Sequence, residues 1–146
     1  MRVDFYHLTR SPVALVLPSV AERLLGAGER LLVQSGDAAQ RAQLDVALWD
    51  YRPDSFLPHG CAGGAHDTTQ PVLIAKTLTE ANAARNVALV DGSWDEGALA
   101  FDRAFFFFSS ETIDDARGAW RGLATCEGVE RHYWKQDEAG KWREGP

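Results

Sequence analysis

Hydrophobic and polar positions in the first third of the chain alternate between two periodicities. Residues 2–8 form an apolar and aromatic run that is typical of a buried strand, and residues 30–34 form a second such run. Between them, residues 12–28 carry apolar side chains at helical spacing. Ser11 is placed to cap this helix, and Pro18 is expected to kink or restart it because proline lacks the amide hydrogen. The pattern predicts a strand, a helix and a second strand.

The remaining pattern adds a second helix, which completes a β-α-β-α opening, and then a long loop followed mainly by strands. A helix is predicted from about residue 36 to Trp49, and residues 51–70 predict a long loop rich in Pro, Gly, His and Asp. Alternating strands and helices with short connections favour a parallel sheet with right-handed crossovers. The further expected elements are strands at 72–75, 87–91 and 104–108, a helix at 110–124, and two short strands within 129–142 around a turn at 137–140.

Size and composition predict one ordinary globular domain over residues 1–146. The chain is 45% hydrophobic and 25% charged, and a chain of this length buries enough surface for a core without disulfides. Neither a signal peptide nor an apolar run of about 18 residues is present, so we expect a soluble, cytoplasmic protein that does not enter a membrane. Cys61 and Cys126 are expected to be reduced thiols.

The net charge argues against one class of function. At −6, with a pI near 5.1, the chain lacks the basic excess by which proteins hold duplex nucleic acid. Binding of single strands by stacking on aromatic side chains stays open, because the chain has seven Phe, five Trp and three Tyr residues. Most of these aromatic residues lie in predicted strands or on inward helix faces, where core packing explains them.

A glycine-rich segment, residues 59–67, is one candidate for metal or enzyme chemistry. It carries His59, Cys61, His66 and Asp67, which are all residue types that bind zinc, but the sequence has no second cluster to complete a structural site. Its glycines equally fit a tight connection. We therefore predict no metal, and keep as the alternative function a small α/β metal- or nucleotide-dependent enzyme that uses this segment or Asp91.

Nucleotide binding and nucleophilic catalysis lack their usual motifs. The chain has neither G-x-x-x-x-G-K-[ST] nor G-x-G-x-x-G, and it has no G-x-S-x-G nucleophile elbow. Asp91 precedes Gly92 at a predicted strand end, where α/β enzymes place acids, yet a strand-ending Asp-Gly turn accounts for it equally. The fold is expected to be Rossmann-like without a nucleotide fingerprint, and no catalytic residue is assigned.

The last predicted helix holds a more specific arrangement. Arg117 and Arg121 lie one turn apart beside Trp120, along the edge of the apolar stripe. Two guanidinium groups flanking an indole can receive a carboxylate and an adjacent apolar group. Arginines that cover a core-packed helix with their aliphatic stems are the alternative. The inward stripe itself is predicted to consist of Ile113, Ala116, Trp120, Leu123 and Ala124.

One block of residues carries a family resemblance. Leu44-Asp45-Val46-Ala47-Leu48-Trp49, followed by Ser55-Phe56-Leu57-Pro58-His59, resembles the signature of the chi subunit of bacterial DNA polymerase III. The resemblance implies a three-layer α/β fold with a largely parallel central sheet and helices on both faces. It also implies a non-catalytic adaptor of the replication machinery that needs no cofactor.

The resemblance further implies two partners and their contact residues. Members of the family bind the acidic C-terminal tail of single-stranded DNA-binding protein, which ends in phenylalanine, and link it to the clamp loader through the psi subunit. Their R-x-x-Y-K pattern falls on Arg117, Trp120 and Arg121, so an indole replaces the phenol and Arg replaces Lys. Trp49 is the further expected tail contact, and Phe56 matches the aromatic residue that contacts psi.

Overall fold

The computed structural model describes residues 1–51 and 57–145. Strands and helices alternate in the first third of the chain, as the sequence predicted, and strands joined by loops and short 3-10 turns then follow before the last helix. The elements are β1 (Arg2–His7), α1 (Val13–Gly26), β2 (Leu31–Gln34), α2 (Ala38–Trp49), β3 (His59–Cys61), β4 (Val72–Ala75), β5 (Asn86–Leu89), β6 (Arg103–Phe108), α3 (Ile113–Leu123), β7 (Glu130–Gln136) and β8 (Trp142–Glu144), with short 3-10 turns at Asp67–Thr69, Glu96–Ala100 and Ser110–Thr112.

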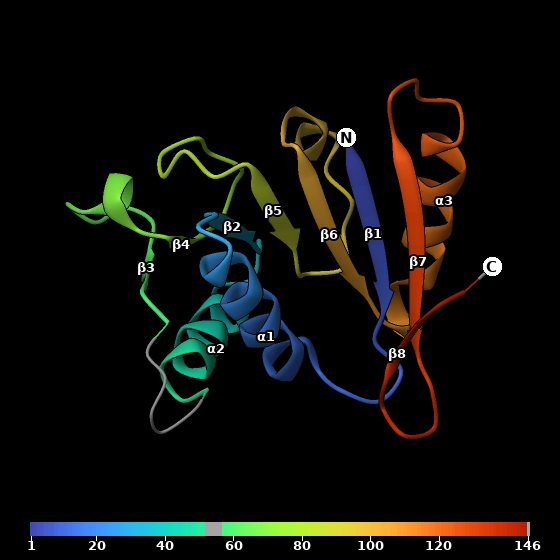
Figure 1. Cartoon of the computed structure of the whole chain (residues 1–146), viewed down its shortest axis with the longest axis horizontal. Coiled ribbons are helices and arrows are strands. Elements are labelled where there is room, and N and C mark those ends of the chain that lie inside the picture. The colour runs from blue at the N-terminus through green and yellow to red at the C-terminus, as the bar shows by residue number, and fades with distance from the viewer. Residues whose placement is uncertain (52–56, 146) are drawn as a thin grey trace.

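The strands form one eight-stranded sheet in the order β3-β4-β2-β5-β6-β1-β7-β8. Every neighbouring pair is parallel except β7 and β8, which form an antiparallel hairpin at one edge. Figure 1 shows this hairpin beside β1, with the N-terminus at the opposite end of β1 from α1. The prediction of a largely parallel central sheet is confirmed.

Helices cover both faces of the sheet, so the predicted three-layer α/β architecture is also confirmed. Alternate residues of a strand point to opposite faces. In β1, Tyr6 packs with the core beneath α1 and α2, whereas Val3 and Phe5 pack with the core beneath α3. β6 divides in the same way, with Phe105 and Phe107 in the first core and Ala104, Phe106 and Phe108 in the second. This division places aromatic rings directly under α3.

Some local predictions were wrong. The predicted loop 51–70 contains β3, a short edge strand that pairs in parallel with β4. Ser11 does not cap α1: its backbone amide donates to Gln136 Oε1, and its hydroxyl accepts from Gln136 Nε2, because the C-terminal strands lie beside this loop. Of the two effects expected of Pro18, a kink or a restart, the restart is wrong, because α1 continues from Val13 to Gly26 as one helix.

Two further expectations concern the chain's second half. Ala124, predicted to be in the inward stripe, is exposed at the end of α3, and Ala116 and Leu123 are the residues of this helix that are fully buried. The turn 137–140 joins β7 and β8 as predicted, and Asp137 accepts the amides of Ala139 and Lys141. In residues 1–51 and 57–145, no helix combines the length and apolar character that crossing a membrane requires.

Candidate functional site

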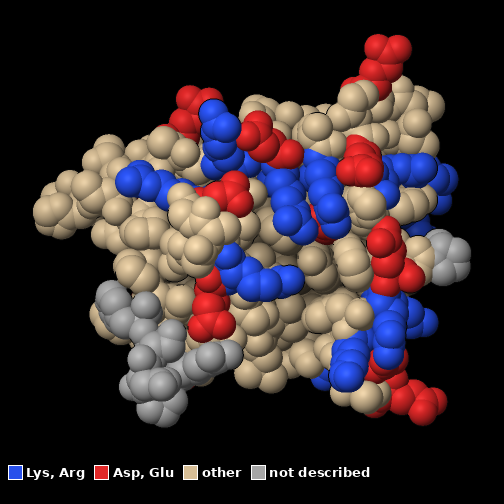
Figure 2. Space-filling view, viewed as in Figure 1, with Lys and Arg blue, Asp and Glu red and all other residues tan. Residues whose placement is uncertain are grey.

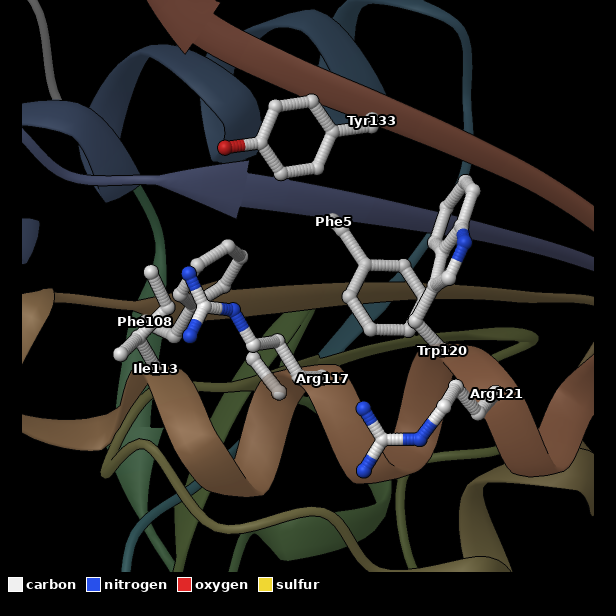
Figure 3. A pocket seen from close by; sticks show the side chains of 8 residues that line it. Phe5, Phe108, Ile113, Arg117, Trp120, Arg121 and Tyr133 are labelled. Carbon is white, nitrogen blue, oxygen red and sulfur yellow. The ribbon is translucent and has the colours of Figure 1, made fainter. Parts of the chain in front are cut away.

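A pocket of about 240 Å³ lies between α3 and the sheet (Figure 3). Strands β1, β6 and β7 supply its floor, and α3 supplies the opposite wall. The register of the sheet brings the floor together, because Phe5 is paired with Tyr133 on one side and His7 with Phe108 on the other. The lining residues are Phe5, Phe108, Ile113, Ala116, Arg117, Trp120, Arg121 and Tyr133.

The interior of the pocket is aromatic. The Trp120 ring meets the Phe5 ring edge to face, with centroids 5.1 Å apart and planes at 81°. Tyr133 contacts Trp120 in the same manner at 6.3 Å. These geometries are favourable for aromatic pairs and leave ring faces and edges available to a further ring. The pocket therefore suits an apolar or aromatic group.

The two arginines of α3 line this pocket, as Figure 3 shows. Arg117 lies 3.9 Å from Asp114, but its side chain is 64% exposed and that of Asp114 is 99% exposed. An ion pair of this kind contributes little and exchanges readily with a competing anion. Arg121 has no carboxylate within 4.0 Å among the residues that the structure describes. Both guanidinium groups can therefore receive an anion from outside the chain.

A buried histidine lies beside the aromatic floor. His7 stacks on Phe108 with ring centroids 4.8 Å apart, and its Nδ1 lies 2.9 Å from the Tyr133 hydroxyl. Burial lowers the pKa of His7, and the charges of Lys135 and Arg117 lower it further. A neutral imidazole at this position adds no competing charge beside Arg117.

Trp49 is not brought to this pocket. It belongs to α2, in the layer on the other face of the sheet, and its side chain is 54% exposed. Its ring contacts His59 edge to face at 5.1 Å. Phe56, the expected psi contact, lies outside the residues that the structure describes. The expected site thus separates into Arg117, Trp120 and Arg121 on one face and Trp49 on the other.

The signature block that carries the family resemblance has a structural role in the described residues. His59 Nε2 lies 2.9 Å from Asp45 Oδ1, and its Nδ1 lies 2.7 Å from the carbonyl oxygen of Leu57. Leu44 and Leu48 of α2 are fully buried beside Leu57. This block fixes the end of α2 against the start of β3.

Two carboxylates that were considered for enzyme chemistry accept hydrogen bonds from the backbone. Asp67 accepts the amides of Gly63 and Gly64, at 2.9 and 3.1 Å. Asp91 lines a hollow of about 520 Å³ at the carboxyl ends of the parallel strands, but its two oxygens accept the amides of Gly36 and Ser93. In the described ranges, no three His, Cys, Asp or Glu side chains are grouped as metal ligands. The geometry gives these residues a structural role.

Sequence reasoning missed the strand residues of the pocket. Phe5, Phe108 and Tyr133 come from three segments of the chain, and each was assigned only to a strand. The alternation of β7 did contain a signal, because Arg131, Tyr133 and Lys135 occupy every second position. Only the register with β1 shows that this row faces α3.

Comparison with known proteins identifies the family of this chain. The family described as DNA polymerase III chi subunit, HolC, matches residues 1–130. A protein named DNA polymerase III subunit chi from Pseudomonas aeruginosa is 33% identical over 76 residues, which are 50% of this chain and 52% of that protein. The chain thus spans about half the length of that relative. The protein of the same name from Escherichia coli K12 is 29% identical over 102 residues, 69% of each chain. This chain therefore belongs to the DNA polymerase III chi subunit family.

Proposed function

We propose that the pocket under α3 binds the acidic C-terminal tail of single-stranded DNA-binding protein and so links that protein to the polymerase III clamp loader. The observation that carries the proposal is the pair of weakly engaged guanidinium groups at the border of an aromatic pocket. A chain end with a carboxylate, a phenyl ring and preceding acids has complementary chemistry.

Each residue has a separate part in this binding. Arg117 pairs with the terminal carboxylate, Arg121 attracts the acidic residues before it, and Trp120 forms a wall for the phenylalanine ring. The volume supports this assignment, because an apolar cavity of about 150 Å³ admits benzene and the pocket offers about 240 Å³. Under this proposal Trp49 has no part in the pocket, since α2 lies on the other face of the sheet.

The expected affinity is modest. A short peptide covers little area, so the dissociation constant should be on the order of micromolar. Several tails on one oligomeric partner would raise the avidity without new contacts. A psi-type partner would dock through Phe56.

The test compares two peptides and two proteins by isothermal titration calorimetry. A peptide with acidic residues and a C-terminal phenylalanine should bind the wild type, and its C-terminally amidated form should bind about tenfold more weakly or worse, as expected for loss of a charged hydrogen bond. Arg117→Gln should weaken the free-acid peptide similarly and no longer discriminate between the two. The control is Arg143→Gln, which removes an equal charge from β8, outside the pocket lining.

Two alternative functions, direct binding of single-stranded DNA and a small enzyme, predict different experimental results. Binding of a single-stranded oligonucleotide without any partner protein, with no binding of the peptide, would favour direct stacking on DNA. A rise in melting temperature with a divalent metal or a nucleotide, with none from the peptide, would favour the small enzyme. Equal affinity of the wild type and Arg117→Gln for the free-acid peptide would remove Arg117 from the tail site.

A further inference from the structure

One residue of β7, Arg131, contacts both the ring and the backbone carbonyl of Trp120. Arg131 Cζ lies 4.2 Å from the centroid of the Trp120 ring, and Arg131 Nη1 donates to the Trp120 carbonyl oxygen at 2.7 Å. We infer that Arg131 is a positioning residue, which fixes the Trp120 indole as the wall of the pocket. The inference concerns the free protein first, and its consequence for peptide affinity rests on the proposed function.

The sheet register places Arg131 where it can do this. In β7, Arg131 is paired with Val3 of β1, and Tyr133 is paired with Phe5. Val3, Phe5 and Tyr133 all pack in the core under α3, so the Arg131 side chain leaves the sheet on the same face. The path from β7 to the last turn of α3 is therefore direct.

Two contacts of different kinds make this positioning of Trp120 specific to arginine. A planar guanidinium can lie over an aromatic ring while one of its N–H groups donates to a nearby carbonyl. The ammonium of lysine carries the same charge but lacks this plane. Arg131 has no carboxylate within 4.0 Å among the described residues, so these two contacts are its principal ones there.

Trp120 needs such a hold because α3 itself constrains it little. The ring is only partly buried, and the fully buried side chains of the helix are Ala116 and Leu123. Phe5 and Tyr133 meet the indole at 81° and 82°, which leaves a ring face for the guanidinium. A wall held in place before binding spares the ligand the entropy cost of ordering it.

The experiment observes Trp120 directly. The protein is labelled with 5-fluorotryptophan, and the Trp120 signal is assigned by its loss in Trp120→Phe. In the peptide-free protein, Arg131→Met and Arg131→Lys should both shift and broaden the Trp120 signal and leave the other four tryptophan signals near their wild-type positions. The control variant Arg85→Met removes an 80% exposed arginine at the start of β5 and should leave Trp120 unchanged.

Peptide titrations of the same variants complete the test. Both Arg131 variants should bind the phenylalanine-ended peptide about 3- to 10-fold more weakly, as expected for loss of a partly exposed cation–π contact. The loss should persist at high salt, where long-range attraction is screened.

The outcomes separate the two ideas. An unchanged Trp120 signal in both variants, or a Lys variant identical to wild type in signal and affinity, overturns the positioning role. A wild-type protein that fails to bind the peptide overturns the proposed function alone, because the fluorine signals of the free protein still decide the role of Arg131. If Arg131→Met does not fold, the Lys variant decides it.

Discussion

The most unusual single residue is Asp4, a carboxylate with no solvent exposure in the middle of β1. Arg2 donates to it from Nε and Nη2 at 3.0–3.1 Å, Arg103 donates from Nε at 2.9 Å, and Trp134 donates from Nε1 at 2.9 Å. Burial alone would raise the pKa of Asp4, but the bonds from Arg2, Trp134 and Arg103 outweigh it and lower the pKa. A buried charge with this many donors is fully compensated.

Replacing Asp4 by Asn should therefore destabilise the fold considerably. The substitution keeps the shape but leaves two arginines without their carboxylate, and we expect a loss of about 2–4 kcal/mol in the free energy of unfolding, measured by urea denaturation at pH 7. The control is Asp102→Asn, whose exposed pair with Arg85 spans 3.5 Å and should contribute less than about 1 kcal/mol. A similar loss for both variants would contradict the role of Asp4.

The pH dependence of stability provides a second test of the role of Asp4. Because the pKa of Asp4 is lower in the folded protein than its ordinary value of 3.8, its contribution is fully present above pH 3.8. The contribution is lost as the pH falls from 3.8 through the folded pKa. The difference in the free energy of unfolding between the wild type and Asp4→Asn should accordingly become smaller as the pH falls below 3.8.

At the scale of elements, α3 forms one wall of the pocket although its sequence gives it low intrinsic helix stability. It carries two glycines within eleven residues, and the Cβ of an alanine at position 118, in place of Gly118, would have open space around it. Gly92, in contrast, has φ +81°, and a Cβ there would come within 2.5 Å of Thr112, immediately before α3. Position 118 can thus accept a Cβ atom, whereas position 92 cannot accept one without strain.

Alanine substitutions at the two positions should therefore change the free energy of unfolding in opposite directions. Gly118→Ala should raise the free energy of unfolding by about 0.5–1 kcal/mol, because alanine favours the helix and restricts the unfolded chain. Gly92→Ala should lower it by more than about 1 kcal/mol, because it adds a left-handed backbone penalty to a steric clash. Urea denaturation measures both, and a stabilising Gly92→Ala would show that the turn can relax.

Most elements could be predicted because each carries its own periodicity. The strands around Phe106 and Leu73 are continuous apolar runs, and α3 has a clear helical stripe. β3 could not be predicted, since three residues that include Gly60 and a histidine hold no pattern, and pairing with β4 alone makes them a strand. The capping role expected of Ser11 failed for a similar reason, because Gln136 lies 125 residues away in sequence.

The candidate site was predictable only where it is local. Arg117, Trp120 and Arg121 lie on one helix, so helical spacing was enough to group them. Phe5, Phe108 and Tyr133 belong to three strands, and their meeting depends on sheet register, which sequence patterns do not specify. Trp49 was expected near the same site by resemblance, and the layer in which α2 lies could not be deduced from the motif.

At the scale of the whole molecule, the distribution of charge decides how an acidic ligand is received. Figure 2 shows both signs side by side over the face that carries α1 and α2. With a net charge of −6, the protein as a whole repels an acidic peptide. Binding under the proposed function depends on local attraction at Arg117 and Arg121, which must exceed this long-range repulsion.

The salt dependence of peptide affinity should show whether local attraction or long-range repulsion prevails. Between about 0.05 and 0.5 M salt, peptide affinity should fall by roughly an order of magnitude, because screening acts on exposed guanidinium groups. Arg121→Gln should reduce the slope of affinity against salt, whereas Trp120→Phe should weaken binding at every salt concentration and keep the slope. Calorimetric titrations measure both, and affinity that rises with salt would mean that repulsion dominates.

The pocket joins residues from Phe5 to Tyr133, nearly the full length of the chain. During synthesis Phe5 is therefore made long before Tyr133, and a chain that ends before Tyr133 lacks part of the pocket lining. A partner that needs the whole lining would require a chain that extends at least to β7.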